Sequence, residues 1–224
     1  MCYSYWHIPY TMATIPPTKL ALVRSLYYEQ QLSAREISEK LHVPLNAVYY
    51  FMRRHAIARR SGALNSRIQF AKKPPSFSVP ASLSKAQQRL KDIGVVLYWC
   101  EGYKQSTSHG VDFANSDPAM IALFMRFLRE VCHIQENRTR AYVYCHDKAL
   151  VAEHERYWQK VTGIPSAQFT KTYVRHNRSP HTRMKHGLVH IRYSDKKLLQ
   201  CILDWIEEYK NESVGTQVVN GGTL

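Results

Sequence analysis

Alternation of apolar and polar residues in the second half of the chain is the feature that most constrains its fold. In RTRAYVYC (residues 138–145), every second residue from Ala141 onward is apolar, and the residues between are tyrosines. Successive side chains of a β-strand point to opposite faces of the sheet, so this pattern predicts a strand with one face on a core. FTKTYVRH (169–176) and LVHIRYS (188–194) alternate in the same way, and we expect them to form a strand pair.

The polar side of these strands carries almost no acidic residues. A solvated surface ordinarily mixes charges of both signs, whereas this one is cationic and aromatic. An open sheet face of that composition is suited to lie on a polyanion, and nucleic acid is the first expectation. The pattern predicts nucleic-acid contacts from Arg140, Tyr142, Lys171, Tyr173, His190 and Arg192.

The charge of the whole chain favours the same partner. Lysine and arginine number 31 against 17 acidic residues, which gives a formal net charge of +14. No acid occurs between Lys40 and Lys91 or between Arg156 and Ser194. We expect cations in these windows to contact phosphates. They include Arg175, on the face of the predicted strand 169–176, and, outside the strand faces, Arg53, Arg54, Arg59, Arg60, Arg67, Lys72, Lys73, Arg178, Arg183 and Lys185.

Residues 18–57 have apolar positions at three- and four-residue steps, which predicts helices. Ser33 and Glu36 form a capping box that opens a second helix, and Pro44 suits the first turn of a third. The stretch SAREISEKLHVPLNAVYYFMRR resembles the DNA-binding helix-turn-helix of resolvase-like and transcription-regulator families. The resemblance implies that the third helix enters the major groove of double-stranded DNA, with contacts from Asn46, Tyr49 and Tyr50.

The remaining patterns divide the chain. Residues 61–84 are basic and proline-containing without sustained periodicity, which predicts a linker. Helical and strand patterns then alternate as far as residue 210. We therefore expect an α+β protein with four parts. They are an all-α helix-turn-helix domain (1–60), the basic linker (61–84), a mixed α/β domain with helices on one face of an antiparallel sheet (85–210), and a disordered tail (211–224).

Cysteine usage and hydropathy indicate the compartment. The five cysteines are scattered and form no CxxC pair, which is typical of reduced thiols. The start of the chain has no secretory signal pattern, and no stretch reaches the length of a membrane span. We expect a cytoplasmic or nucleoid-associated protein without a membrane partner.

The stretch GVVLYWCEGYK (94–104) raises a separate question. Its apolar run ends in Glu101 and then Gly102. A glycine that ends a helix commonly does so in the left-handed conformation. Glu101 would then lie in the last turn, where the negative end of the helix dipole disfavours an anion. The residue is either an ordinary solvated glutamate, or a metal ion or a basic group offsets the dipole there.

Residues 86–210 resemble a LAGLIDADG homing-endonuclease domain. The resemblance rests on Glu101-Gly102 in the place of the motif's closing acid and glycine, on FANSDPAMIALFMRFL, and on IRYSDKKLLQCILDWI. It implies that Glu101 is the catalytic acid and a ligand of Mg²⁺, which prefers carboxylate and phosphate oxygens. With one motif per chain, it also implies a homodimer and a two-fold symmetric DNA site.

Two functions follow from these resemblances. The first is a Mg²⁺-dependent, site-specific endonuclease that acts as a homodimer. The second is a non-catalytic transcription regulator that retains the fold, because a sporulation regulator joins a similar domain to a helix-turn-helix in the opposite order. An RNA-binding, maturase-like protein is a third alternative, since the basic sheet would accept a duplex of either kind.

Overall fold

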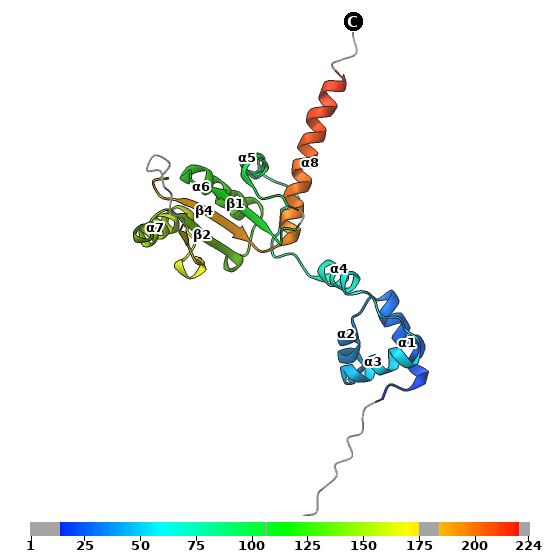
Figure 1. Ribbon diagram of the computed structural model, residues 1–224. Helices are drawn as coiled ribbons and strands as arrows, with labels where there is room; N and C mark the ends of the chain where they lie inside the picture. Colours follow the sequence, from blue (N-terminus) through cyan, green and yellow to red (C-terminus); the bar gives the residue numbers. More distant parts are fainter. Residues whose placement is uncertain (1–13, 106, 175–183, 220–224) are drawn as a thin grey trace, which may run out of the picture. The chain divides into compact units, whose positions relative to one another are not determined.

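The chain divides into two compact units, residues 1–74 and 75–224, and combines helices with a mixed sheet (Figure 1). The computed structural model describes residues 14–105, 107–174 and 184–219. In chain order, with η for 3-10 and π turns, the elements are η1 (Pro17–Lys19), α1 (Leu20–Arg24), η2 (Ser25–Glu29), α2 (Ala34–Leu41), α3 (Leu45–Arg54), α4 (Gly62–Lys72), α5 (Lys85–Glu101), β1 (Val111–Asn115), α6 (Pro118–Arg126), η3 (Phe127–Val131), η4 (Glu136–Arg138), β2 (Thr139–Cys145), η5 (Lys148–Leu150), α7 (Val151–Thr162), η6 (Ser166–Gln168), β3 (Tyr173–Val174), β4 (Leu188–Tyr193) and α8 (Lys196–Val219).

The first unit is helical and closes around a small apolar core. The capping box at the start of α2 is confirmed: Ser33 accepts from the Glu36 amide at 3.2 Å, and Glu36 accepts from the Ser33 amide at 2.6 Å. α2 ends at His42, whose φ of 54° is left-handed, and α3 begins directly after Pro44. The core side chains are fully or almost fully buried, namely Ile15, Val23, Leu26, Tyr27, Ile37, Val48, Phe51, Met52 and Ile57.

The predicted linker is wrong over residues 62–72. Residues Gly62–Lys72 form α4, which Ser61 caps by accepting from the Leu64 amide, and α4 belongs to the first unit. Residues from 75 onward belong to the second unit. Helix α4 was not predictable from its own periodicity, because none of its residues is buried.

The second unit contains a four-stranded sheet in the order β1-β4-β2-β3. β4 lies between β1 and β2 and is antiparallel to both. The expected all-antiparallel sheet is wrong at its edge, because β3 runs parallel to β2, with Tyr144 opposite Tyr173. The expected pairing of 169–176 with 188–194 is also wrong. β4 has β1 and β2 as its two neighbours, and β3 pairs with β2 instead.

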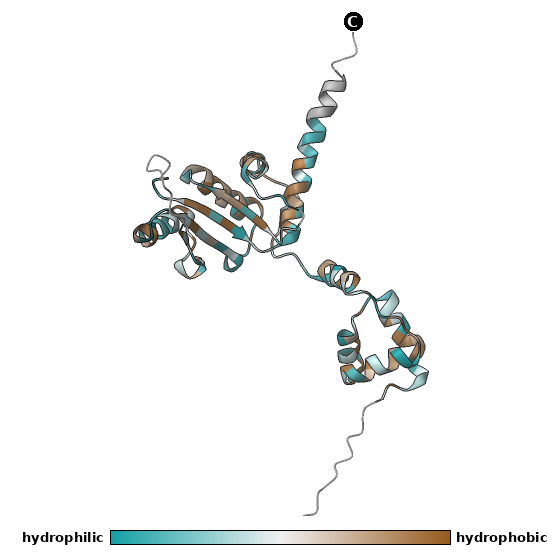
Figure 2. Ribbon diagram, viewed as in Figure 1, coloured by the Kyte–Doolittle hydropathy of each residue, from teal (hydrophilic) through white to brown (hydrophobic). Residues whose placement is uncertain are grey.

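One face of the sheet packs on helices α5 to α8 to form the core of the unit. Its central side chains, Ala141, Val143, Val189 and Ile191, are completely buried. This is the face that the alternation predicted, and Figure 2 shows hydrophobic and hydrophilic positions alternating along the strands. Arg140 and Arg192 are exposed on the other face, as is Tyr144, four residues beyond Arg140 on β2.

α8 continues through Val219, so the predicted disordered tail is wrong over residues 211–219; residues 220–224 lie outside the described part of the chain. The helix starts in the core, where Leu198 and Ile202 are fully buried. Once a helix is nucleated, each further residue adds a hydrogen bond at little cost. The polar composition of this segment therefore does not end the helix.

Candidate nucleic-acid interface

The face of α3 opposite its core side carries the side chains expected to contact DNA. Asn46, Tyr49, Tyr50 and Arg53 are all exposed and follow three- and four-residue steps, which places them on one side of the helix. The other side is anchored by Val48, Phe51 and Met52, which are at most 3% exposed. The helix α3 therefore has one face buried in the core and an opposite, exposed face that is polar, aromatic and cationic.

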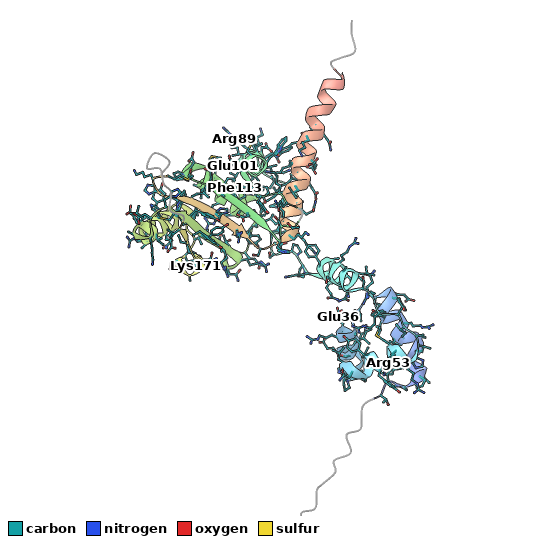
Figure 3. All side chains as sticks on the ribbon, viewed as in Figure 1. Glu36, Arg53, Arg89, Glu101, Phe113 and Lys171 are labelled. Atoms are coloured by element: carbon teal, nitrogen blue, oxygen red, sulfur yellow. The ribbon has the colours of Figure 1, made fainter. Side chains whose placement is uncertain are left out.

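Tyrosine rings on this exposed face hold arginines in place. The guanidinium of Arg59 lies 4.8 Å from the ring centre of Tyr49, and that of Arg53 lies 5.9 Å from the ring of Tyr50. Arg54 donates from Nη1 to the Tyr50 hydroxyl at 3.4 Å. The surface is hollowed between α3 and the segment after it, and the hollow is lined by Asn46, Tyr49, Tyr50, Met52, Arg53, Ile57 and Arg59. Figure 3 labels Arg53 on this helix.

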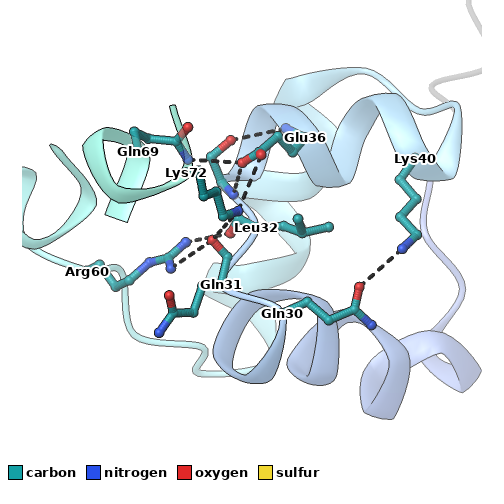
Figure 4. A network of polar contacts seen from close by, with 9 residues as sticks. Gln30, Gln31, Leu32, Glu36, Lys40, Arg60, Gln69 and Lys72 are labelled. Carbon is teal, nitrogen blue, oxygen red and sulfur yellow. Dashed lines mark hydrogen bonds and ion pairs between the residues drawn. The ribbon is translucent and has the colours of Figure 1, made fainter. Parts of the chain in front are cut away.

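Two of the predicted phosphate contacts are used inside the unit instead (Figure 4). Arg60 donates to the carbonyl oxygens of Gln31 and Leu32 at 3.2 and 2.5 Å and packs its guanidinium 4.2 Å from the Tyr27 ring. Lys72 donates to the Gln31 carbonyl at 3.0 Å and pairs with Glu36 at 3.4 Å. These contacts fix α4 against the start of α2. Arg67 and Lys73 are exposed on or just after α4.

Glu36 is the centre of that network. Its carboxylate also accepts from the Gln69 side chain at 3.0 Å. Burial opposes ionisation, but hydrogen bonds from Ser33, Gln69 and Lys72 outweigh it and lower the pKa of Glu36 to about 2. The acid is therefore a structural anchor for α4.

On the sheet, an acid that the sequence analysis did not single out lies among the predicted cations. Asp112 of β1 pairs with Arg192 Nε at 2.7 Å and with His190 Nδ1 at 2.9 Å. Burial opposes its ionisation, but hydrogen bonds from His190 and Arg192 lower the pKa of Asp112. Because Asp112 offsets the charge of Arg192 and occupies Nδ1 of His190, these two residues offer less to a phosphate than predicted. Alternation in VDFAN, with Val111 and Phe113 apolar, was the signal that put Asp112 on this face.

The remaining sheet residues divide into buried and exposed sets. Tyr142 is only 5% exposed, because neighbouring rings cover it. Arg140 is exposed and donates to the carbonyls of Asn137 and Thr139, both at 2.7 Å. Lys171 (labelled in Figure 3), Tyr173 and Lys185 are exposed. The predicted contacts at Arg175, Arg178 and Arg183 lie outside the described residues.

Glu101 is exposed at the end of α5, which runs over the predicted residues 85–101. The expected left-handed glycine is wrong, since Gly102 is extended with φ of −76°. Glycine is required there for another reason: a Cβ atom would lie 2.5 Å from the Tyr98 ring and from its carbonyl oxygen. Lys104 Nζ donates to the carbonyls of Trp99 and Gly102, both at 2.8 Å, so an ammonium group offsets the helix dipole.

The predicted Mg²⁺ site rests on one residue of the chain, Glu101. No group of three or more histidine, cysteine, aspartate or glutamate side chains that could hold a metal occurs among residues 14–105, 107–174 and 184–219. Mg²⁺ takes several oxygen ligands in near-octahedral geometry, and Glu101 supplies a single carboxylate. A Mg²⁺ ion at Glu101 would take its other ligands from water, from DNA phosphates or from a second copy of the chain.

Comparison of the chain with protein-family models, with curated proteins and with solved structures finds no match to any of them. Among the residues that the structure describes, no helix combines the length and the apolar character needed to cross a membrane.

Proposed function

We propose that this chain is a sequence-specific, duplex-DNA-binding protein that reads bases with α3. The observation that carries the proposal is the exposed face of α3, with an amide (Asn46), two tyrosines and Arg53 and no acid, opposite a buried face. α2, the short turn at His42 and α3 have the order of a helix-turn-helix, in which the second helix enters the major groove. The net charge of +14 supports attraction to a polyanion.

The division of labour within α3 follows from its chemistry. A carboxamide can make two hydrogen bonds to adenine in the major groove, so Asn46 near the start of the helix is proposed to read a base. Arginines at its end are better suited to phosphates, which position a protein on DNA without specifying sequence. Arg53 and Arg59 are held for that role by the tyrosine rings beside them.

The test is selection of bound molecules from a random duplex library, followed by sequencing. The proposal requires enrichment of a short motif and a steep loss of affinity with salt. Recovery of unenriched sequence at low salt would leave only non-specific attraction and would contradict it.

A second candidate is a Mg²⁺-dependent endonuclease that acts as a homodimer, and a specific observation favours it. On α5, Val96 (46% exposed), Trp99 (38%) and Cys100 form an exposed strip that leads to the end of the helix at Glu101. A second copy that covered this strip would bring two Glu101 carboxylates to one place, which one chain cannot do. If the protein is such an endonuclease, residues 85–210 are proposed to have a LAGLIDADG-like fold.

The same selected duplex tests the second candidate. With Mg²⁺ present, the wild type should cut it and Glu101→Gln should bind without cutting. A wild type that never cuts its own site, under conditions in which it binds, would remove the nuclease and leave the DNA-binding proposal standing.

A further inference from the structure

A group of aromatic side chains on the open face of the sheet does not belong to the α3 surface. Tyr144 of β2 and Tyr173 of β3 are register partners, and their rings are stacked with centres 5.1 Å apart and planes 19° apart. They remain 36% and 56% exposed. Scattered exposed apolar groups are common on proteins, but a contiguous patch of them marks a contact surface.

The rings next to this pair on the same face are packed against it. Tyr142 is 5% exposed and stacks on His190 with ring centres 4.3 Å apart. It also meets Tyr173 edge-on at 5.6 Å, and the Arg192 guanidinium lies 4.7 Å from its ring. His190 and Arg192 are in turn fixed by Asp112. The two exposed rings therefore adjoin a packed group of side chains, and binding would not have to order that group first.

The position of the pair in the sheet leaves it accessible. β3 is the edge strand, so no other strand of the described sheet lies beyond Tyr173. Two exposed cations lie close by in the chain: Lys171, two residues before Tyr173, and Arg140, two residues before Tyr142 on the same face of β2. An aromatic surface with flanking cations is complementary to a chain of bases joined by phosphates.

A fully paired duplex presents its phosphates and base edges and keeps its base faces stacked inside. Flat, exposed rings have nothing to stack on in such a duplex. Unpaired bases do offer their faces, and stacking on tyrosine is tolerant of sequence because every base has such a face. The ring geometry therefore favours a single strand over a duplex on this surface.

We propose that Tyr144 and Tyr173 form a stacking platform for unpaired bases of single-stranded DNA, with Lys171 and Arg140 next to its phosphates. The platform is a separate surface from α3, and its existence does not depend on sequence reading by that helix. It would allow the protein to hold a locally opened strand.

The test measures fluorescence anisotropy of a labelled oligothymidylate of 20 nucleotides, a matching oligouridylate and a fully paired duplex with the full chain and its variants. Tyr144→Ala and Tyr173→Ala should each weaken oligothymidylate binding about tenfold, the range for loss of one base–aromatic stack. Tyr144→Phe and Tyr173→Phe keep the ring and should bind within twofold of the wild type. The matched control is Tyr28→Ala, which removes an equally exposed ring (51%) from the first unit.

Any of four results would overturn the platform. The first two are a wild type that does not bind oligothymidylate, and alanine variants that melt normally and bind it unchanged. The other two are an equal loss of affinity for the duplex, and a loss confined to the oligouridylate. Asn46→Ala, which belongs to the proposed α3 surface, should weaken duplex recognition and leave oligothymidylate binding unchanged. Failure of one surface is thus distinguishable from failure of the other.

Discussion

At the scale of single residues, Lys104 offers a structural reason why α5 can end in an acid. Its ammonium group donates to two carbonyls at the end of the helix, at 2.8 Å each, where the dipole is negative. The sequence pattern left open whether a metal or a basic group would offset the dipole at Glu101. In the folded chain a basic group, the Lys104 ammonium, does so.

Replacing that ammonium should weaken the fold. We predict that Lys104→Met lowers the free energy of unfolding by about 1 kcal/mol, because two hydrogen bonds to helix-end carbonyls are lost. Lys85→Met, at the opposite end of the same helix, is the control and should leave stability unchanged or slightly raised. Urea unfolding measures both. If both variants lost the same free energy of unfolding, the contacts of Lys104 with the end of the helix would not explain its effect.

Glu36 predicts a dependence of stability on pH. Its folded pKa of about 2 lies below the ordinary value of 4.5, so ionised Glu36 stabilises the fold fully above that ordinary value. The contribution is lost as pH falls towards 2. Glu36→Gln should therefore lower the melting temperature at pH 7, and the difference from wild type should shrink towards pH 2.

Circular dichroism melting between pH 2 and pH 7 checks this prediction. Glu39→Gln is the matched control, since it removes an exposed acid from the same helix and should have little effect at any pH. A difference between Glu36→Gln and the wild type that stayed constant across this range would contradict the proposed anchoring role.

At the scale of elements, the sequence predicted what depends on local pattern and missed what depends on distant contacts. The strands β2 and β4 and the bounds of α5 follow from alternation, helical spacing and a capping serine. The parallel pairing of β3 depends on which strand already covers β4, and local pattern does not contain that information. α4 depends on Lys72 and Gln69 reaching Glu36, more than thirty residues away.

The candidate interface shows the same division. The exposed face of α3 could be read from spacing, because its buried face has a helical period. Spacing could not predict that Arg60 is used inside the first unit or that Arg192 pairs with Asp112, because both depend on tertiary contacts. Counting cations along the chain therefore overestimates the charge available to a partner.

At the scale of the whole molecule, the two units should be separable. The core of the second unit consists of residues within 75–224. Asp195 at the start of α8 accepts from the Ser76 amide at 2.8 Å and from the Ser76 hydroxyl at 2.6 Å. Burial opposes its ionisation, but these bonds and those from the amides of Lys197 and Leu198 lower the pKa of Asp195.

We predict that a fragment of residues 75–224 folds with a cooperative thermal transition. A fragment of residues 81–224 should be less stable by about 3 kcal/mol, because a buried carboxylate loses its Ser76 partners. Equilibrium unfolding of the two fragments measures the difference. Equal stability would show that residues 75–80 are a linker after all.

The most direct test of the central claim, that α3 reads DNA sequence, compares Asn46→Ala with wild type on the selected duplex and on its single-base-pair variants. Wild type should lose about 1–3 kcal/mol of affinity when the base pair that Asn46 contacts is changed. Asn46→Ala should no longer distinguish bases at that position and should keep the wild-type preference at the others. Arg53→Ala should weaken binding to every duplex alike. An Asn46→Ala protein that keeps the full base preference of the wild type, or loses affinity equally on selected and random DNA, would contradict the account.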